Sequence, residues 1–237
     1  MKKKNKRWII GGGISLIVLC VMGMLILHSP ARKQEPVEQP EDAQVQEGMF
    51  PYRIPDTSLV IQKVRPYDGV FIEDGSDREV AMISAIVVEN AGDEYIEYAK
   101  ISMECNGKPL LYELKTLEPK GVIIVQESTA AAYEEGEYCN CSAEIATMGS
   151  LDMSEDYVEI EETNTGSIRI TNISGKDIPS IRIFYKYYNN ETKVLLGGIT
   201  YTISVTDMKK GETREVIPSH YEKGVSRIMM VRTYDIY

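Results

Sequence analysis

Three cysteines, Cys105, Cys139 and Cys141, are the residues best suited to chemistry, because thiols form disulfides, bind metals and carry redox reactions. Cys139 and Cys141 alternate with polar residues, which predicts that both point inward from one strand. Their Cα atoms would lie about 7 Å apart, so a bond between them would need distortion, whereas Cys105 could meet either if its strand lies opposite. Without a neighbouring histidine the three make a poor zinc site. The sequence favours buried free thiols over a disulfide.

A single histidine limits the catalytic arrangements available beyond residue 28. A Ser/His/Asp triad would have to use His220, and Ser219, adjacent in the chain, is badly placed to hydrogen-bond to it. We expect His220 in a connecting loop before the last strand. The sequence also lacks a phosphate-binding loop and a dinucleotide glycine fingerprint. No catalytic residue, cofactor, cofactor-binding residue or metal ligand is therefore predicted, and the chain is not expected to be an enzyme.

Two short acidic segments, residues 73–77 and 152–156, could supply the several oxygen ligands that Ca²⁺ prefers. Neither has a recognised ligand spacing. We therefore expect both segments to be solvated turns.

Tyrosine is the main aromatic residue, with 15 Tyr against 3 Phe and 1 Trp. A tyrosine combines a large apolar ring with a polar hydroxyl, which suits it to recognition surfaces. Tyrosines at inward strand positions should pack in the core, whereas outward ones could contact a partner. Tyr188, Tyr234 and Tyr237 are the candidate partner contacts.

The elements that must position these side chains are strands, because apolar residues recur at every second position. Residues 199–205 alternate Ile, Tyr, Ile and Val with Thr, Thr and Ser, and residues 99–105 alternate in the same way. Turn-forming sequences such as Asn-Ala-Gly-Asp at 90–93 and Lys-Gly-Glu at 210–212 separate such runs. Short alternating strands between turns indicate antiparallel β-sandwiches.

The same pattern occurs twice along the chain, which indicates an internal repeat. Without a gap, residues 90–105 align with residues 172–187. Farther on, the turn that ends in Gly121 corresponds to the turn that ends in Gly211. We therefore predict two copies of one module.

The second copy resembles a known family of envelope domains. From Asn172 it reads Asn-Ile-Ser-Gly-Lys-Asp-Ile-Pro-Ser-Ile-Arg-Ile-Phe-Tyr-Lys-Tyr-Tyr, followed by Leu-Leu-Gly-Gly and a Gly-Glu-Thr turn. This pattern is similar to the FxLYD-type β-sandwich modules of bacterial and archaeal envelope proteins over residues 157–220, and more faintly over 75–130. Asn189 stands where the family pattern has an aspartate. The resemblance implies an envelope domain and offers no catalytic residues.

The N-terminal region has the pattern of a membrane anchor. Five Lys or Arg side chains among the first seven residues precede an uncharged run at 8–27, which as a helix would span about 30 Å, the thickness of bilayer hydrocarbon. The basic residues favour a cytoplasmic N-terminus. A cleaved signal peptide is the alternative, but the length of the run and the His-Ser-Pro-Ala at 28–31 argue against cleavage.

The predicted organisation combines this anchor with the repeat. We expect a basic cytoplasmic tail (1–7), a transmembrane α-helix (8–28), a disordered Pro/Glu-rich stalk (29–50), and an all-β ectodomain of two tandem antiparallel immunoglobulin-like β-sandwiches (56–149 and 150–237). Such a protein would be single-pass in the cell membrane, with its ectodomain outside, in the envelope of a Gram-positive bacterium.

The function expected from these patterns is binding without catalysis. The bilayer is the partner of residues 8–28, and an envelope protein or a cell-wall polymer is the expected partner of the β-modules. The net charge of −10 excludes nucleic acid, because an acidic ectodomain repels phosphate backbones. The alternative is an accessory or scaffolding subunit of a membrane transport or secretion complex.

Overall fold

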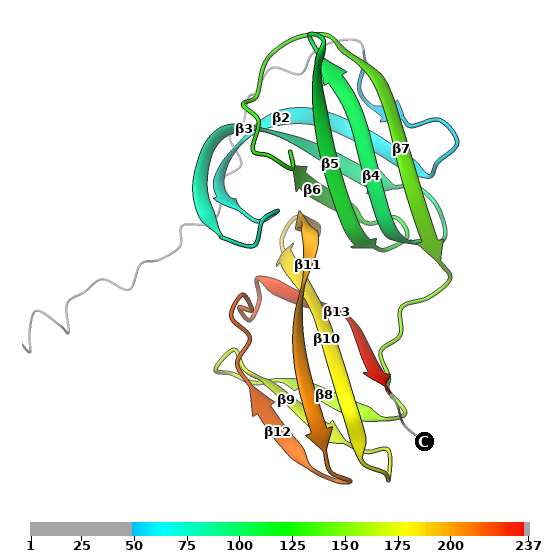
Figure 1. Ribbon diagram of the computed structural model, residues 1–237, viewed down its shortest axis with the longest axis vertical. Helices are drawn as coiled ribbons and strands as arrows, with labels where there is room; N and C mark the ends of the chain where they lie inside the picture. The colour runs from blue at the N-terminus through cyan, green and yellow to red at the C-terminus, as the bar shows by residue number, and fades with distance from the viewer. Residues whose placement is uncertain (1–48, 235–237) are drawn as a thin grey trace, which may run out of the picture. The chain divides into compact units, whose positions relative to one another are not determined.

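A computed structural model describes residues 49–234, and these residues are all-β (Figure 1). The predicted basic tail, membrane helix and most of the stalk lie outside the described residues, as does Tyr237. Residues 49–234 contain no helix that is long and apolar enough to cross a bilayer.

The described residues form thirteen strands. For clarity, residues 49–149 are called the first half and residues 150–234 the second half. The strands are β1 (Tyr52–Arg53), β2 (Leu59–Phe71), β3 (Arg78–Asn90), β4 (Tyr95–Cys105), β5 (Lys108–Leu117), β6 (Val122–Gln126) and β7 (Tyr138–Met148) in the first half, and β8 (Val158–Glu162), β9 (Ile168–Asn172), β10 (Ile178–Asn189), β11 (Val194–Met208), β12 (Thr213–Val216) and β13 (Ser226–Tyr234) in the second.

These strands form three sheets, one of which runs through both halves. The seven-stranded sheet has the order β1-β2-β3-β6-β11-β10-β13, and the two three-stranded sheets have the orders β5-β4-β7 and β12-β9-β8. Strand β11 joins the halves, because it pairs antiparallel with β10 and parallel with β6. The other pairings between the named strands are antiparallel.

The core of the first half lies between two layers, one of β2, β3 and β6 and the other of β4, β5 and β7. The alternation predicted for residues 99–105 is confirmed, since Ala99, Ile101, Met103 and Cys105 are all buried. Burial of a large aliphatic side chain contributes about 1.5–3 kcal/mol, so these inward faces are the main force that holds the layers together.

The core of the second half is built in the same way. Ile168 and Ile170 of β9 pack against Ile181 and Ile183 of β10 and Val231 of β13, and all five are fully buried. The strands of the two halves also pair in the same order: β5-β4-β7 corresponds to β11-β10-β13, and β2-β3-β6 corresponds to β8-β9-β12. The sequence repeat is therefore accompanied by a repeat of strand topology.

One buried asparagine occupies the same position in each half. Asn90 and Asn172 are 0% and 1% exposed and end β3 and β9. Asn90 Nδ2 donates to the backbone oxygen of Glu94 at 2.8 Å, and Asn172 Nδ2 donates to that of Lys176 at 2.8 Å. Each Oδ1 accepts from the backbone N–H two residues on, at 3.1 and 3.0 Å. Each asparagine thus satisfies the backbone of a turn that the strands leave unpaired.

The expected match of Gly121 with Gly211 is wrong by one residue. The N–H groups of Lys120 and Gly211 donate to the backbone oxygens of Asn90 and Asn172, respectively, so Lys120 corresponds to Gly211. Their φ angles are +59° and +72°. The turn has the same length in both halves. In the first half Lys120 has the left-handed backbone conformation, which glycine adopts at a lower steric cost because it has no Cβ.

Candidate functional site

The candidate functional site is the junction, defined here by the contacts between the two halves. Residues 194–196 of β11 pair with residues 122–124 of β6, and Gly197 and Gly198 follow directly. An ideal Cβ on Gly198 would lie 1.7 Å from the backbone oxygen of Glu113 on β5. Gly197 has φ +81°. The two glycines let β11 pass against the backbone of the first half more closely than any side chain would allow.

A carboxylate from the first half and an amine from the second contact the same Gly197–Gly198 backbone. Both carboxylate oxygens of Glu73 accept from the N–H of Gly198, at 2.8 and 2.9 Å, and Oε1 accepts from the N–H of Gln126 at 3.1 Å. Lys186 Nζ donates to the backbone oxygens of Gly197 at 3.0 Å, Gly198 at 2.8 Å and Ile199 at 2.6 Å.

Burial governs the electrostatics of these two groups. Lys186 is 0% exposed, and burial lowers its pKa to about 7 although the charge of Glu73 opposes the shift. Burial also raises the pKa of Glu73, against the backbone hydrogen bonds from Gly198 and Gln126 that favour the carboxylate. Each group depends on backbone dipoles in place of water. Lys186 finds its three acceptors within the second half, whereas Glu73 takes donors from both halves, Gly198 of the second and Gln126 of the first.

A second set of contacts is centred on Asp77. Its Oδ1 accepts from the Tyr201 hydroxyl at 2.8 Å, and its Oδ2 accepts from the Tyr187 hydroxyl at 3.3 Å and lies 3.2 Å from His220 Nε2. The rings of Tyr201 and His220 stack with centroids 4.5 Å apart. Burial and the Asp77 carboxylate raise the pKa of Tyr187 to about 12 and also raise that of Tyr201. Both hydroxyls therefore remain protonated donors at neutral pH.

The expected poor placement of Ser219 is wrong, because Ser219 Oγ lies 2.8 Å from His220 Nδ1. A turn at these two residues folds the imidazole back toward the hydroxyl. With Asp77 on Nε2, this gives a Ser–His–Asp series of hydrogen-bonding groups. The Asp77 carboxylate also accepts from two tyrosine hydroxyls and the ring is stacked on Tyr201, so we interpret the series as a link across the junction. As predicted, His220 lies in the loop between β12 and β13.

A third contact is a bidentate ion pair. Arg227 Nη1 and Nη2 donate to the two carboxylate oxygens of Glu118, at 2.8 and 2.7 Å. The same guanidinium lies 5.3 Å from the ring centroid of Tyr188. Tyr188, a candidate partner contact, packs partly buried against the core of the first half. The structure thus places this tyrosine at the junction.

The first acidic segment differs from the solvated turn that was expected, whereas the second is largely as expected. In residues 73–77, Glu73 and Asp77 contact the second half, and only Asp74 of the three carboxylates is exposed. In residues 152–156, all three carboxylates are exposed and residues 155–156 lie in a turn. Only Ser154 is buried, and its hydroxyl donates to the backbone oxygen of Val231 at 3.1 Å. Within residues 49–234, no group of three or more His, Cys, Asp or Glu side chains is arranged to hold a metal ion.

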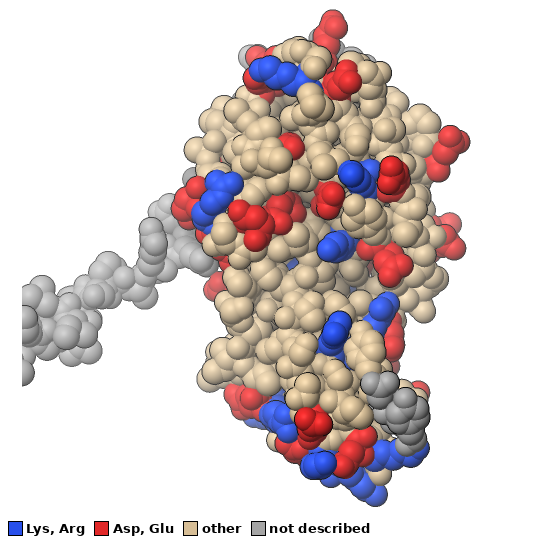
Figure 2. All heavy atoms as spheres, in the orientation of Figure 1, with Lys and Arg blue, Asp and Glu red and all other residues tan. Residues whose placement is uncertain are grey.

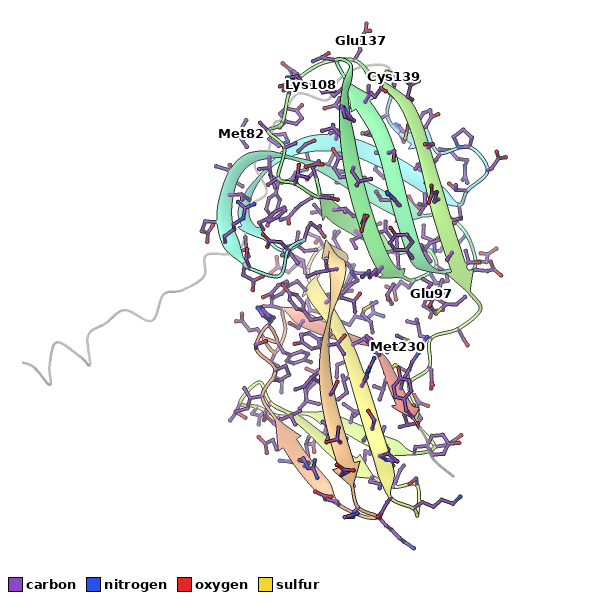
Figure 3. All side chains as sticks on the ribbon, viewed as in Figure 1. Met82, Glu97, Lys108, Glu137, Cys139 and Met230 are labelled. Carbon is purple, nitrogen blue, oxygen red and sulfur yellow. The ribbon has the colours of Figure 1, made fainter. Side chains whose placement is uncertain are left out.

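All three described cysteines are free, and only two of them are buried. Cys105 and Cys141 are 3% and 9% exposed, in agreement with the packed thiols that the sequence favours. The inward orientation expected for Cys139 is wrong, because Cys139 is exposed near the start of β7 (Figure 3). A bulge, with Asn140 at φ +52° and a register shift opposite Ser102 and Glu104, inserts a residue and turns Cys139 outward.

Thiol labelling should separate these cysteines. We expect maleimide to modify Cys139 in the native chain and to reach Cys105 and Cys141 only after denaturation, because burial excludes the reagent. Peptide mass spectrometry would locate the label, with Cys139→Ser as the control. Failure to label Cys105 and Cys141 in denaturant without reductant would mean that they form a disulfide.

Sequence reasoning missed the residues that matter most at the junction. The sequence predicts Glu73 in a solvated turn, and its patterns give neither Lys186 nor Gly198 as a candidate functional residue. A usable signal was present: a lysine between Tyr185 and Tyr187 and two successive glycines within an apolar strand are both unusual for a buried sheet.

Comparisons with known families and curated proteins identify no relative of this chain. No protein-family model matches the sequence, and no curated protein matches it at a significant level. The resemblance to FxLYD-type modules therefore stays a prediction. The residues of the junction, Tyr234 and the three described cysteines must be interpreted from their contacts alone.

Proposed function

We propose that this chain is a membrane-anchored extracytoplasmic protein whose two tandem immunoglobulin-like β-sandwiches bind another envelope component without catalysis. The observation that carries the proposal is the junction. A shared sheet, the Glu73 contact with Gly198, and the Glu118–Arg227 pair join the halves at several separate points. Such a joint resists bending, so the two modules can hold a binding surface in a constant position relative to the stalk.

The geometry of the Ser219–His220–Asp77 series also favours binding over catalysis. In a hydrolytic triad the carboxylate orients the imidazole through Nδ1 and the nucleophile contacts Nε2. In this chain the two contacts are exchanged, with Ser219 at Nδ1 and Asp77 at Nε2. Here Asp77 is shared with Tyr187 and Tyr201. A serine-directed fluorophosphonate should therefore leave Ser219 unmodified, and stoichiometric labelling that is lost in Ser219→Ala would contradict a non-enzymatic function.

The proposed location predicts that external protease reaches the C-terminal end of the chain. In intact cells with a tag after Tyr237, we expect protease to remove the tag while the chain stays in the membrane fraction, because only residues 1–7 would be cytoplasmic. A tag protected until the cells are lysed would contradict the proposed topology. A cytoplasmic protein in the same cells serves as the integrity control.

The same tagged chain distinguishes the accessory-subunit alternative. Replacing residues 1–28 with an unrelated anchor should preserve binding through the β-modules, measured by capture after mild crosslinking. Loss of one dominant membrane complex on this exchange would favour a subunit that assembles through its helix. Retention of the same partners would favour the free-standing binding module.

A further inference from the structure

The outward face of β10, β11 and β13 carries a row of charge that its counterpart in the first half lacks. Arg182 on β10 lies opposite Arg232 on β13 and Ser204 on β11. In the repeat, Arg182 corresponds to Lys100 of β4, which lies between Glu113 of β5 and Glu144 of β7. The equivalent rows are therefore Ser–Arg–Arg in the second half and Glu–Lys–Glu in the first.

Like charges on directly opposed strand positions destabilise a sheet, because their Cβ atoms are only about 5 Å apart. Among the described residues, no carboxylate lies within ion-pair distance of Arg182 or Arg232. Arg182 is exposed and Arg232 is partly exposed, so both can be reached from solvent. An anion bound between the two guanidinium groups would convert their repulsion into attraction.

The row next to the arginines adds an aromatic ring and hydroxyl groups. Ser180 lies between Thr206 and Tyr234, and the guanidinium of Arg182 lies 5.4 Å from the ring centroid of Tyr234. Tyr234 is one of the tyrosines that the sequence marks as a candidate partner contact. On the other side of the arginines, Met230 of β13 is only 5% exposed, whereas Thr202 of β11 in the same row is exposed.

The overall acidity of the chain does not prevent an anion from binding here. Charged side chains of both signs are interspersed with neutral surface (Figure 2). The second half has 11 Lys and Arg against 12 Asp and Glu, whereas the first half has 8 against 18. The acidity thus belongs mainly to the first half, and exposed charges more than about 8 Å away are largely screened at physiological ionic strength.

Two arginines flanked by hydroxyls fit a phosphate group on a hydroxyl-rich chain. Guanidinium groups approaching from two sides suit the tetrahedral oxygens of a phosphate, and arginine clusters are the usual receptors for it. The hydroxyls of Ser180, Ser204 and Thr206 can bond to polyol or sugar hydroxyls. An acidic peptide would instead gain most from backbone pairing at a strand edge, and these side chains stand on the face of the sheet.

We infer that the face formed by Arg182, Arg232, Tyr234, Ser180, Ser204 and Thr206, here called the arginine face, binds a polyol or sugar chain that carries phosphodiester groups. This inference rests on the proposed function, since it specifies the envelope component that the modules bind.

The test measures binding of lipid-free poly(glycerol phosphate) to the full chain in neutral detergent micelles by biolayer interferometry. We expect binding that weakens as salt rises, and a loss of at least about tenfold in affinity for Arg182→Gln/Arg232→Gln, or about 1.4 kcal/mol. Removing a like-charged pair costs no stability, so misfolding does not explain such a loss. The matched control Lys63→Gln/Lys100→Gln makes the same change in charge on the first half and should stay within about twofold.

Three outcomes would overturn the inference: no binding by the unmodified chain, an equal loss in the control variant, or tighter binding of poly-glutamate of the same charge, which would indicate an acidic peptide. The protease experiment tests location separately. If the chain binds the polymer in micelles but the tag is protected from protease in intact cells, the proposed function is rejected and the arginine face remains a phosphate site. If the tag is accessible but the chain does not bind the polymer, only the arginine face is rejected.

Discussion

Gly198→Ala is expected to lower the free energy of unfolding by roughly 3 kcal/mol or more, an effect at the upper end for a single added methyl group. The new Cβ would lie 1.7 Å from the backbone oxygen of Glu113, which a side-chain rotation cannot relieve. Gly198 has an ordinary φ angle, so the cost is steric and not conformational. Relief requires β11 to move away from β5, which would break the Glu73 hydrogen bonds to Gly198.

Urea denaturation of the purified chain measures this loss, and hydrogen exchange locates it. Amides of residues 194–198 and 122–126 should lose protection together, since β6 and β11 pair there. Gly149→Ala is the matched control, because a Cβ at Gly149 meets nothing within 4 Å, and it should change the free energy of unfolding by less than about 0.5 kcal/mol. Equal stability of the two variants would contradict the close approach described here.

Alternation in the sequence predicted the parts of the fold that depend on one strand at a time. Val205 is buried and Ile203 partly buried on the core side of β11, whereas Thr202 and Ser204 are exposed. The aligned Asn90 and Asn172 prove to be equivalent buried residues. These features follow from a local period of two and from turn chemistry, both of which a single sequence records directly.

The junction could not be predicted in this way, because it depends on strands far apart in the chain. The parallel pairing of β6 with β11 joins residues about seventy positions apart, and period-two alternation does not say which strands become neighbours. The partial burial of Glu73 and Asp77 and the full burial of Lys186 follow only once that pairing exists. The acidic composition of residues 73–77 therefore predicted exposed carboxylates, although the second half covers two of them, Glu73 and Asp77.

Two smaller errors have local causes. The outward turn of Cys139 results from a β-bulge, and an inserted residue in one strand reverses the faces of all positions on one side of it. The Ser219–His220 hydrogen bond results from a turn, which brings together side chains that an extended strand would point in opposite directions. Neither a bulge nor a turn conformation can be read from alternation alone.

Lys186→Met is expected to lower the free energy of unfolding at neutral pH by roughly 3 kcal/mol, because it removes a fully buried hydrogen-bond donor and the positive charge that favours the Glu73 carboxylate. Three backbone oxygens, those of Gly197, Gly198 and Ile199, would lose their donor. Glu73 would keep its hydrogen bonds to Gly198 and Gln126 but lose the favourable charge of the lysine.

The loss caused by Lys186→Met should grow as pH rises from about 5 to about 9. Lys186 has a pKa lowered to about 7, so above that pH the unfolded chain binds more protons there than the folded chain, and the unmodified protein gains stability with rising pH. The raised pKa of Glu73 has the opposite sign, since its carboxylate is harder to form in the folded state, and removing the lysine charge raises that pKa further. Both effects widen the difference between the two proteins as pH rises.

Urea denaturation at three pH values tests this dependence, with the exposed Lys63→Met as the control, for which a change below about 0.5 kcal/mol is expected at every pH. In Glu73→Gln/Lys186→Met the amide oxygen can still accept from the N–H of Gly198 and no buried charge remains. The double variant should therefore recover part of the lost stability and lose the pH dependence. A double variant as unstable and as pH-sensitive as Lys186→Met would mean that Glu73 and Lys186 act independently, and that the two halves are not joined through the charges that meet at Gly198.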